Sequence, residues 1–116
     1  MLNQVVLVGR LTEDPNLAQT EKGNPVLNVN LAVSRPFKNS DGIYETDFIR
    51  CTLWNGIAEN TSEYCKKGDV IGVKGRLQTH NYVDKEGNKR NTSEVIAERI
   101  TFLSSKKDEQ VEETDE

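Results

Sequence analysis

The sequence is poor in the residues that build metal sites and catalytic centres. Its 116 residues include one histidine and two cysteines, Cys51 and Cys65, which do not form a C-x-x-C pair. A structural zinc site needs four such ligands at characteristic spacings, so we expect neither a metal nor a cofactor. We interpret both cysteines as free thiols of a reducing compartment, and Cys51 as a buried and inert one.

Long apolar segments are also missing. Hydrophobic residues make up 34% of the chain and charged residues 29%, and no stretch approaches the ~20 apolar residues of a membrane span. The opening "MLNQVVLVGR" has no basic segment ahead of its short apolar run, unlike a signal peptide. We therefore expect a cytoplasmic protein, and the length favours a single small domain.

The negative charge is concentrated at the C-terminus. Residues 106–116 contain two lysines and six acidic residues, which account for the whole net charge of −4. We expect this segment to be a disordered acidic tail, and residues 1–105 to form one neutral domain. A neutral net charge neither requires nor excludes binding to nucleic acid. Whether the domain can bind it depends on where its basic side chains lie.

Five segments have the alternation or the β-branched composition of strands. They are residues 3–11, 26–35, 43–54, 69–83 and 92–103. A helical period separates the third from the fourth: Ile57, Thr61, Tyr64 and Cys65 share one face. This β-β-β-α-β-β order predicts an all-β OB-fold, a five-stranded Greek-key barrel with one short helix. Another small barrel or an open α+β sheet are the alternatives.

Smaller signals refine the helix and the fourth strand. Lys66 and Lys67 are expected in the last helical turn, where they complement the dipole, and Gly68 just after its end. Gly72 and Gly75 are expected to help the fourth strand bend around the barrel.

Two strands carry aromatic and basic residues on the side opposite their own apolar face. In residues 43–54, Phe48, Arg50 and Trp54 alternate with the apolar Ile49, Cys51 and Leu53. In residues 69–83, one side carries Ile71, Val73, Gly75 and Leu77, and the other side carries Lys74, Arg76, Gln78, His80 and Tyr82. Rings among cations suit single-stranded nucleic acid, because bases stack on the rings and phosphates attract the cations.

Other interpretations of these residues remain open. The outward rings could form a subunit interface, and His80 is more simply an ordinary surface histidine than a phosphate ligand. Glu45 and Asp47 share the parity of Ile49, so they must lie beyond the core or near a bulge. These two acids, or Asp84 and Glu86, would be the metal ligands of a small nuclease, but no third ligand has a recognisable spacing.

Several blocks together resemble the bacterial single-stranded DNA-binding protein (SSB) family. They are "MLNQVVLVGRLTEDP", "NVNLAVSRPF", "ETDFIRCTLWNGIAENTSEYCKKGD" and "GRLQTHNYVDKEGNKRNTSEV", in that order over roughly residues 1–105. The resemblance implies an OB-fold, a homotetramer, and sequence-independent binding of single-stranded DNA in replication, recombination and repair. It implies no enzymatic activity. An OB-fold protein that mainly binds RNA, or a primosome-type relative, is the alternative.

The resemblance also assigns the binding residues. It implies base stacking on Phe37, Phe48, Trp54 and Tyr82. Candidates for phosphate contact are Arg10, Arg35, Lys38, Arg50, Lys74, Arg76, Lys85, Lys89 and Arg90. The likeness stops at the C-terminus, because family members end in a long linker and an acidic tip with a terminal Pro-Phe, whereas this sequence ends in "EETDE". It therefore does not extend to tail-mediated recruitment of replication and repair partners.

Overall fold

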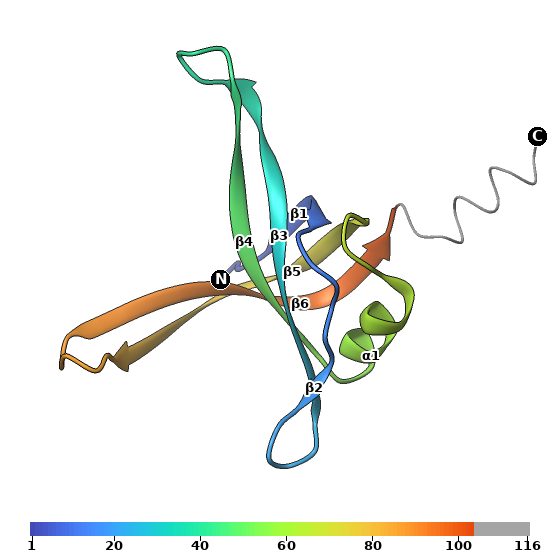
Figure 1. Ribbon diagram of the computed structural model, residues 1–116. Coiled ribbons are helices and arrows are strands. Elements are labelled where there is room, and N and C mark those ends of the chain that lie inside the picture. Colours follow the sequence, from blue (N-terminus) through green and yellow to red (C-terminus); the bar gives the residue numbers. More distant parts are fainter. Residues whose placement is uncertain (104–116) are drawn as a thin grey trace, which may run out of the picture.

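The computed structural model describes residues 1–103, so the predicted acidic tail lies outside the described residues (Figure 1). Its elements, in chain order, are β1 (Val5–Leu11), β2 (Ala18–Gln19), β3 (Pro25–Lys38), β4 (Tyr44–Trp54), α1 (Asn55–Tyr64), β5 (Val70–Val83) and β6 (Lys89–Phe102). The five predicted strands and the helix are all present. The two-residue strand β2, which pairs with the start of β3, was not predicted.

The five long strands close into a barrel. β1 pairs with β5, β5 with β6, β4 with β3 and β3 again with β1, all antiparallel, while β6 joins β4 through a short parallel pairing. Each long strand therefore has two neighbours within the ring, which removes the free edges of an open sheet. The predicted OB-fold is confirmed.

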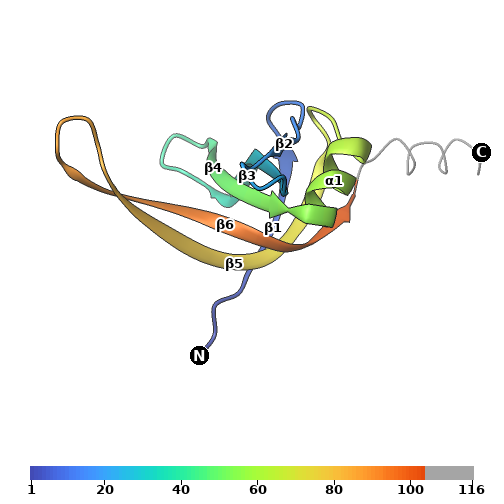
Figure 2. The same cartoon turned by 90° about the horizontal axis from the view of Figure 1, so that it is seen from below.

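Four strands extend beyond the barrel. Past the barrel, β3 and β4 continue as one two-stranded arm, and β5 and β6 continue as a second arm that points in another direction (Figure 1). Figure 2 shows β5 and β6 lying side by side from near α1 out to the tip of their arm. The turn at that tip spans only residues 84–88, so Lys89 and Arg90, expected in the loop, belong to β6.

The core is filled by alternate residues of the strands, as the period of two predicts. Leu27, Val29 and Leu31 of β3 are buried, while Asn28 and Asn30 between them are exposed. Ala58, Thr61 and Cys65 bring one face of α1 and its C-cap onto this core. Both thiols are buried, and burial raises the pKa of Cys51 and of Cys65 to about 11. The prediction that Cys51 is a buried free thiol is confirmed.

The end of the helix differs from the prediction. α1 stops at Tyr64 with Cys65 as its C-cap, so Lys66 and Lys67 lie beyond the last turn. They form a separate turn closed by Asp69, which donates its backbone N–H to the Lys66 carbonyl and accepts one from the Lys66 N–H. Gly68 has a positive φ of 92°, as its residue type suggested, but it serves this turn rather than the helix. The ten-residue α1 is too short and too polar to cross a membrane.

Strand β5 departs from its alternation at one point. Leu77 was grouped with the core residues, but it is 48% exposed. The register of β5 against β6 shifts between Lys74 and Gly75, and beyond this bulge β5 leaves the barrel for the arm. Gly75 fits the bulge, because a Cβ there would lie 2.1 Å from the Ile96 carbonyl oxygen.

Candidate nucleic-acid interface

The outward face of β4 has the composition that its alternation predicts. Cys51 and Leu53 are fully buried, whereas Phe48 is 69% exposed and Trp54 is 39% exposed. Each outward residue lies opposite a residue of β3, with Arg50 opposite Asn30. The two rings and the guanidinium are thus presented by the outward side of β4, along the stretch that pairs with β3 without a register shift.

A surface cavity of about 470 Å³ joins this face to the β5–β6 arm. Trp54 and Arg50 contribute from β4, and His80 and Tyr82 from β5, so the structure brings together residues nearly thirty positions apart. The remaining lining residues are Val26, Asn28, Thr52, Thr92 and Glu94. A space of this size with two ring-bearing walls is suited to a flat, partly polar group such as a nucleobase.

The inner part of this cavity is polar and centred on the carboxylate of Glu94. The Thr52 hydroxyl donates to one carboxylate oxygen at 2.5 Å, and the His80 Nε2 lies 2.5 Å from the other. Burial alone would raise the pKa of Glu94, but hydrogen bonds from Thr52 and His80 and the charges of His80 and Arg50 lower it below its usual value. Glu94 is therefore an anion on the surface that the sequence predicts to bind nucleic acid.

The other two predicted stacking residues lie on β4 and β3, outside this cavity. Phe48 is on β4, opposite Ala32. Phe37 is exposed in the part of β3 where the register against β4 shifts, between Ser34 and Lys38. All four predicted rings are exposed, but only Trp54 and Tyr82 line a common cavity.

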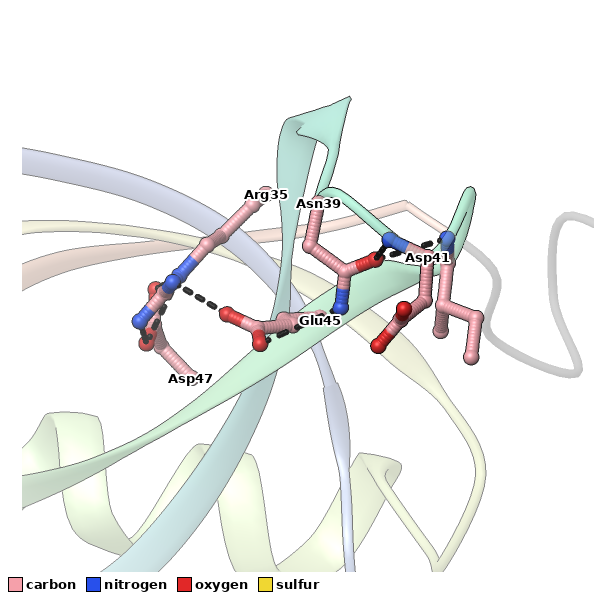
Figure 3. Close-up of polar contacts among 6 residues, drawn as sticks. Arg35, Asn39, Asp41, Glu45 and Asp47 are labelled. Atoms are coloured by element: carbon pink, nitrogen blue, oxygen red, sulfur yellow. Dashed lines mark hydrogen bonds and ion pairs between the residues drawn. The ribbon is translucent and has the colours of Figure 1, made fainter.

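The β3–β4 arm holds its own arginine (Figure 3). Arg35 donates to Asp47 from Nε and Nη2, at distances of 3.0–3.3 Å to the carboxylate oxygens, and it also forms an ion pair with Glu45. The hydrogen bond from Arg35 holds the pKa of Asp47 below its usual range. Glu45 sits opposite the bulge and Asp47 beside it, which confirms the expectation that these acids lie outside the core. Arg35 is already neutralised, and its partners are one of the two acidic pairs considered as metal ligands of a nuclease.

Several other predicted cations also have partners in the structure. Lys38 Nζ lies 5.7 Å from the centre of the Tyr44 ring, Arg10 donates to the Gly68 carbonyl, and Arg76 donates to the Gln78 side chain. Arg90 pairs with Asp84 at 2.9 Å, and that bond lowers the pKa of Asp84.

Besides Arg50, three of the predicted phosphate-contacting cations line cavities. Lys89 and Arg90 line a second cavity, of about 500 Å³, together with Tyr82. Lys74 instead lines a third cavity, whose other residues include Val6, Val8 and Arg99, and which shares no residue with the one containing Trp54.

Sequence reasoning missed the polar residues of this interface. Asn28 and Arg50 line both the Trp54 cavity and a smaller neighbouring one, of about 230 Å³, that also includes Glu13 and Asn30. The alternation of Asn28 and Asn30 with buried β3 residues was visible in the sequence and could have placed them on this face. Glu94 and Thr52 could not have been found in this way, because their roles come from contacts between strands.

A closed OB-type barrel with exposed rings and cations on one face is typical of nucleic-acid-binding proteins. Comparison with known proteins defines the class further. Residues 2–103 match the Single-strand binding protein family. The chain belongs to this family.

Individual relatives agree with this assignment. Single-stranded DNA-binding protein B of Bacillus subtilis is 50% identical over 106 residues, which cover 91% of this chain and 94% of the relative. The single-stranded DNA-binding protein of Oceanobacillus iheyensis is also 50% identical over 106 residues, and that of Halalkalibacterium halodurans is 52% identical over 103. This chain spans 66% and 61% of the length of those two relatives, respectively.

Proposed function

We propose that this protein binds single-stranded DNA without sequence requirement and protects it during replication, recombination and repair. As a member of the Single-strand binding protein family, it is a single-stranded DNA-binding protein and not an enzyme. The observation that carries the proposed mechanism is the cavity in which Trp54, Tyr82 and Arg50 meet. The place of action is the nucleoid of the bacterial cytoplasm, where such strands are exposed.

Stacking on the four exposed rings supplies most of the binding energy in this mechanism. Bases stack on Trp54 and Tyr82 at the cavity, on Phe48 beside it, and on Phe37 along the β3–β4 arm. Each stack is worth about 1–3 kcal/mol, and any base can form it because every base has a π-face. Binding without sequence requirement follows from this use of ring faces.

Phosphate neutralisation falls to the cations that lie nearest the cavities. Arg50 is 62% exposed, and its only recorded ion-pair partner within residues 1–103 is Glu94, with Nε 4.0 Å from the carboxylate. Lys89 and Arg90 flank Tyr82 in the second cavity, and Arg76 and Lys85 are exposed on the same arm. Arg10, Arg35, Lys38 and Lys74 have the partners or positions described above, so we give them at most a minor part.

We also propose that the chain assembles as a homotetramer, which the resemblance implied. Val6 and Val8 are more than half exposed on the outward side of β1, and Leu103 lies beside them in the third cavity. A second copy of the chain is the occupant that would bury this apolar surface. Sedimentation equilibrium measures the assembled mass directly.

The first test is a titration with oligo-dT while the tryptophan fluorescence is recorded. Since Trp54 is the only tryptophan, strong quenching at a stoichiometry of several nucleotides per chain would report stacking at the cavity. An oligo-rU of equal length, run in parallel, separates DNA from RNA preference. Binding without quenching would place Trp54 in a protein interface, and no binding at low salt would refute the proposed function.

A matched pair of variants tests the stacking mechanism. Phe48→Ala should weaken oligo-dT binding by about 1–3 kcal/mol, the energy of one stack. Tyr64→Ala removes another exposed ring, at the end of α1, where it contacts Phe102 with ring centres 6.1 Å apart, and should leave binding unchanged. Equal effects of the two substitutions would contradict stacking on Phe48.

A further inference from the structure

The cavity between Trp54 and Tyr82 contains a carboxylate that the stacking mechanism does not use. The Glu94 side chain is 12% exposed and projects from β6, opposite Gln78 of β5. A phosphate would be repelled by this anion in a partly desolvated setting. The group that enters the cavity is therefore a base rather than the backbone of the DNA.

The hydrogen bonds of Glu94 leave part of its capacity unused. An ionised carboxylate has two oxygens with two lone pairs each and can only accept. One oxygen accepts from Thr52 and the other faces His80, each at 2.5 Å. Arg50, at 4.0 Å, is an ionic neighbour rather than a hydrogen-bond donor. Each oxygen thus keeps one acceptor site, and a ligand that offers an N–H can use it.

Nucleobases differ in what they offer to such an acceptor. Cytosine carries an exocyclic amino group at C4, where uracil and thymine carry a carbonyl oxygen. The amino group donates to a carboxylate, and the carbonyl oxygen, being an acceptor itself, is repelled by it. Adenine also has an exocyclic amino group, on a larger ring system.

We propose that Glu94 makes this cavity a subsite that prefers amino-bearing bases, with cytosine favoured over uracil and thymine, inside an otherwise sequence-independent binding path. The ring stacks on Trp54 or Tyr82, and its amino group donates to the free site on the Glu94 carboxylate. This inference rests on the proposed function. A hydrogen bond to a charged acceptor at a partly exposed site corresponds to a preference of about threefold to tenfold.

The test compares oligo-dC with oligo-dU of equal length at neutral pH. Cytosine and uracil differ at C4, the position that would face Glu94. A homopolymer presents the same base to the cavity however the strand is aligned on the protein. We expect the ratio of the two affinities to fall at least about threefold in Glu94→Gln, because an amide can donate as well as accept. Glu98→Gln makes the same charge change at an exposed position of β6 outside the cavity, and its ratio should match that of the unaltered protein.

A measurement on the unaltered protein guards against a folding defect in the variant. An oligonucleotide of 2-pyrimidinone, which is cytosine without its amino group, should bind about threefold or more weakly than oligo-dC. Equal affinities there, or an unchanged ratio in a folded Glu94→Gln, would overturn the inference and leave Glu94 as a partner of Thr52 and His80 within the fold. Failure of the unaltered protein to bind either homopolymer at low salt would instead refute the proposed function itself.

Discussion

The contrast between Arg50 and Arg35 leads to a prediction about salt dependence. Both were candidates for phosphate contact, but Arg35 is bound by Asp47 and Glu45, while Arg50 is mostly exposed beside the cavity. For single strands, each phosphate contact contributes about −0.7 to the slope of log affinity against log salt concentration. Arg50→Gln should therefore make the slope shallower by about 0.7, and Arg35→Gln should leave it unchanged.

The size of this effect can be worked out for an accessible range of salt. Between about 50 mM and about 200 mM salt, one contact accounts for roughly a 2.6-fold loss of affinity. The unaltered protein and Arg35→Gln should both show this additional loss, and Arg50→Gln should not. Fluorescence anisotropy of a labelled oligo-dT is the suitable assay, because Arg50 shares its cavity with Trp54 and could alter the tryptophan signal.

One outcome would refute the reasoning. If Arg35→Gln lowered the slope by about 0.7 and Arg50→Gln did not, DNA would be drawing Arg35 away from its two carboxylates. The ion pairs of the β3–β4 arm would then be a resting state that binding breaks, and the partner of a cation in the free protein would not indicate its role in the complex.

Two further predictions concern the scaffold and pH. Gly75→Ala should lower the free energy of unfolding by about 3 kcal/mol or more, because the added Cβ would lie 2.1 Å from the Ile96 carbonyl oxygen. Gly72→Ala is the control: the nearest atom to a Cβ there is 3.6 Å away, so this substitution should cost less than about 1 kcal/mol. Urea unfolding measures both, and equal losses would contradict the assigned close approach. The lowered pKa of Glu94 means that its ionised form stabilises the folded state above its ordinary pKa of 4.5 and that this contribution is lost as pH falls through the lower, folded value. The free energy of unfolding should fall more steeply with decreasing pH for the unaltered protein than for Glu94→Gln. Parallel curves would count against the stabilisation of ionised Glu94 by Thr52 and His80.

Much of the fold followed from alternation. The buried Cys51 and Leu53 and the exposed Phe48 and Trp54 were assigned correctly by a period of two, because β4 pairs with β3 without a register shift from Thr46 to Trp54. Leu77 was misplaced, because parity does not indicate the point where a strand loses a neighbour, and β5 is no longer paired with β1 beyond Gly75. The helix end was misplaced because Asp69, not the helix, organises the Lys66–Lys67 turn.

The candidate site was less accessible to sequence reasoning, and the reason is physical. A period of two states which side of a strand a residue occupies, but not which side chain across the sheet will bind it. Arg35 and Arg50 had the same status in the sequence, and only the bulge that places Glu45 and Asp47 beside Arg35 separates them. Nothing in the sequence distinguishes Glu94 from other acidic residues, because its partners Thr52 and His80 lie on two other strands.

These charge partnerships also explain how a neutral domain can prefer single strands. A duplex offers phosphates but hides the faces of its bases, so its affinity depends on the cations that are free to meet it. Here Arg35 and Lys38 already have partners within the fold, and phosphate contacts alone would hold a duplex weakly. A single strand can add stacking on exposed rings, at about 1–3 kcal/mol for each base. The scarcity of free cations together with four exposed rings therefore favours single strands without any group that excludes a duplex.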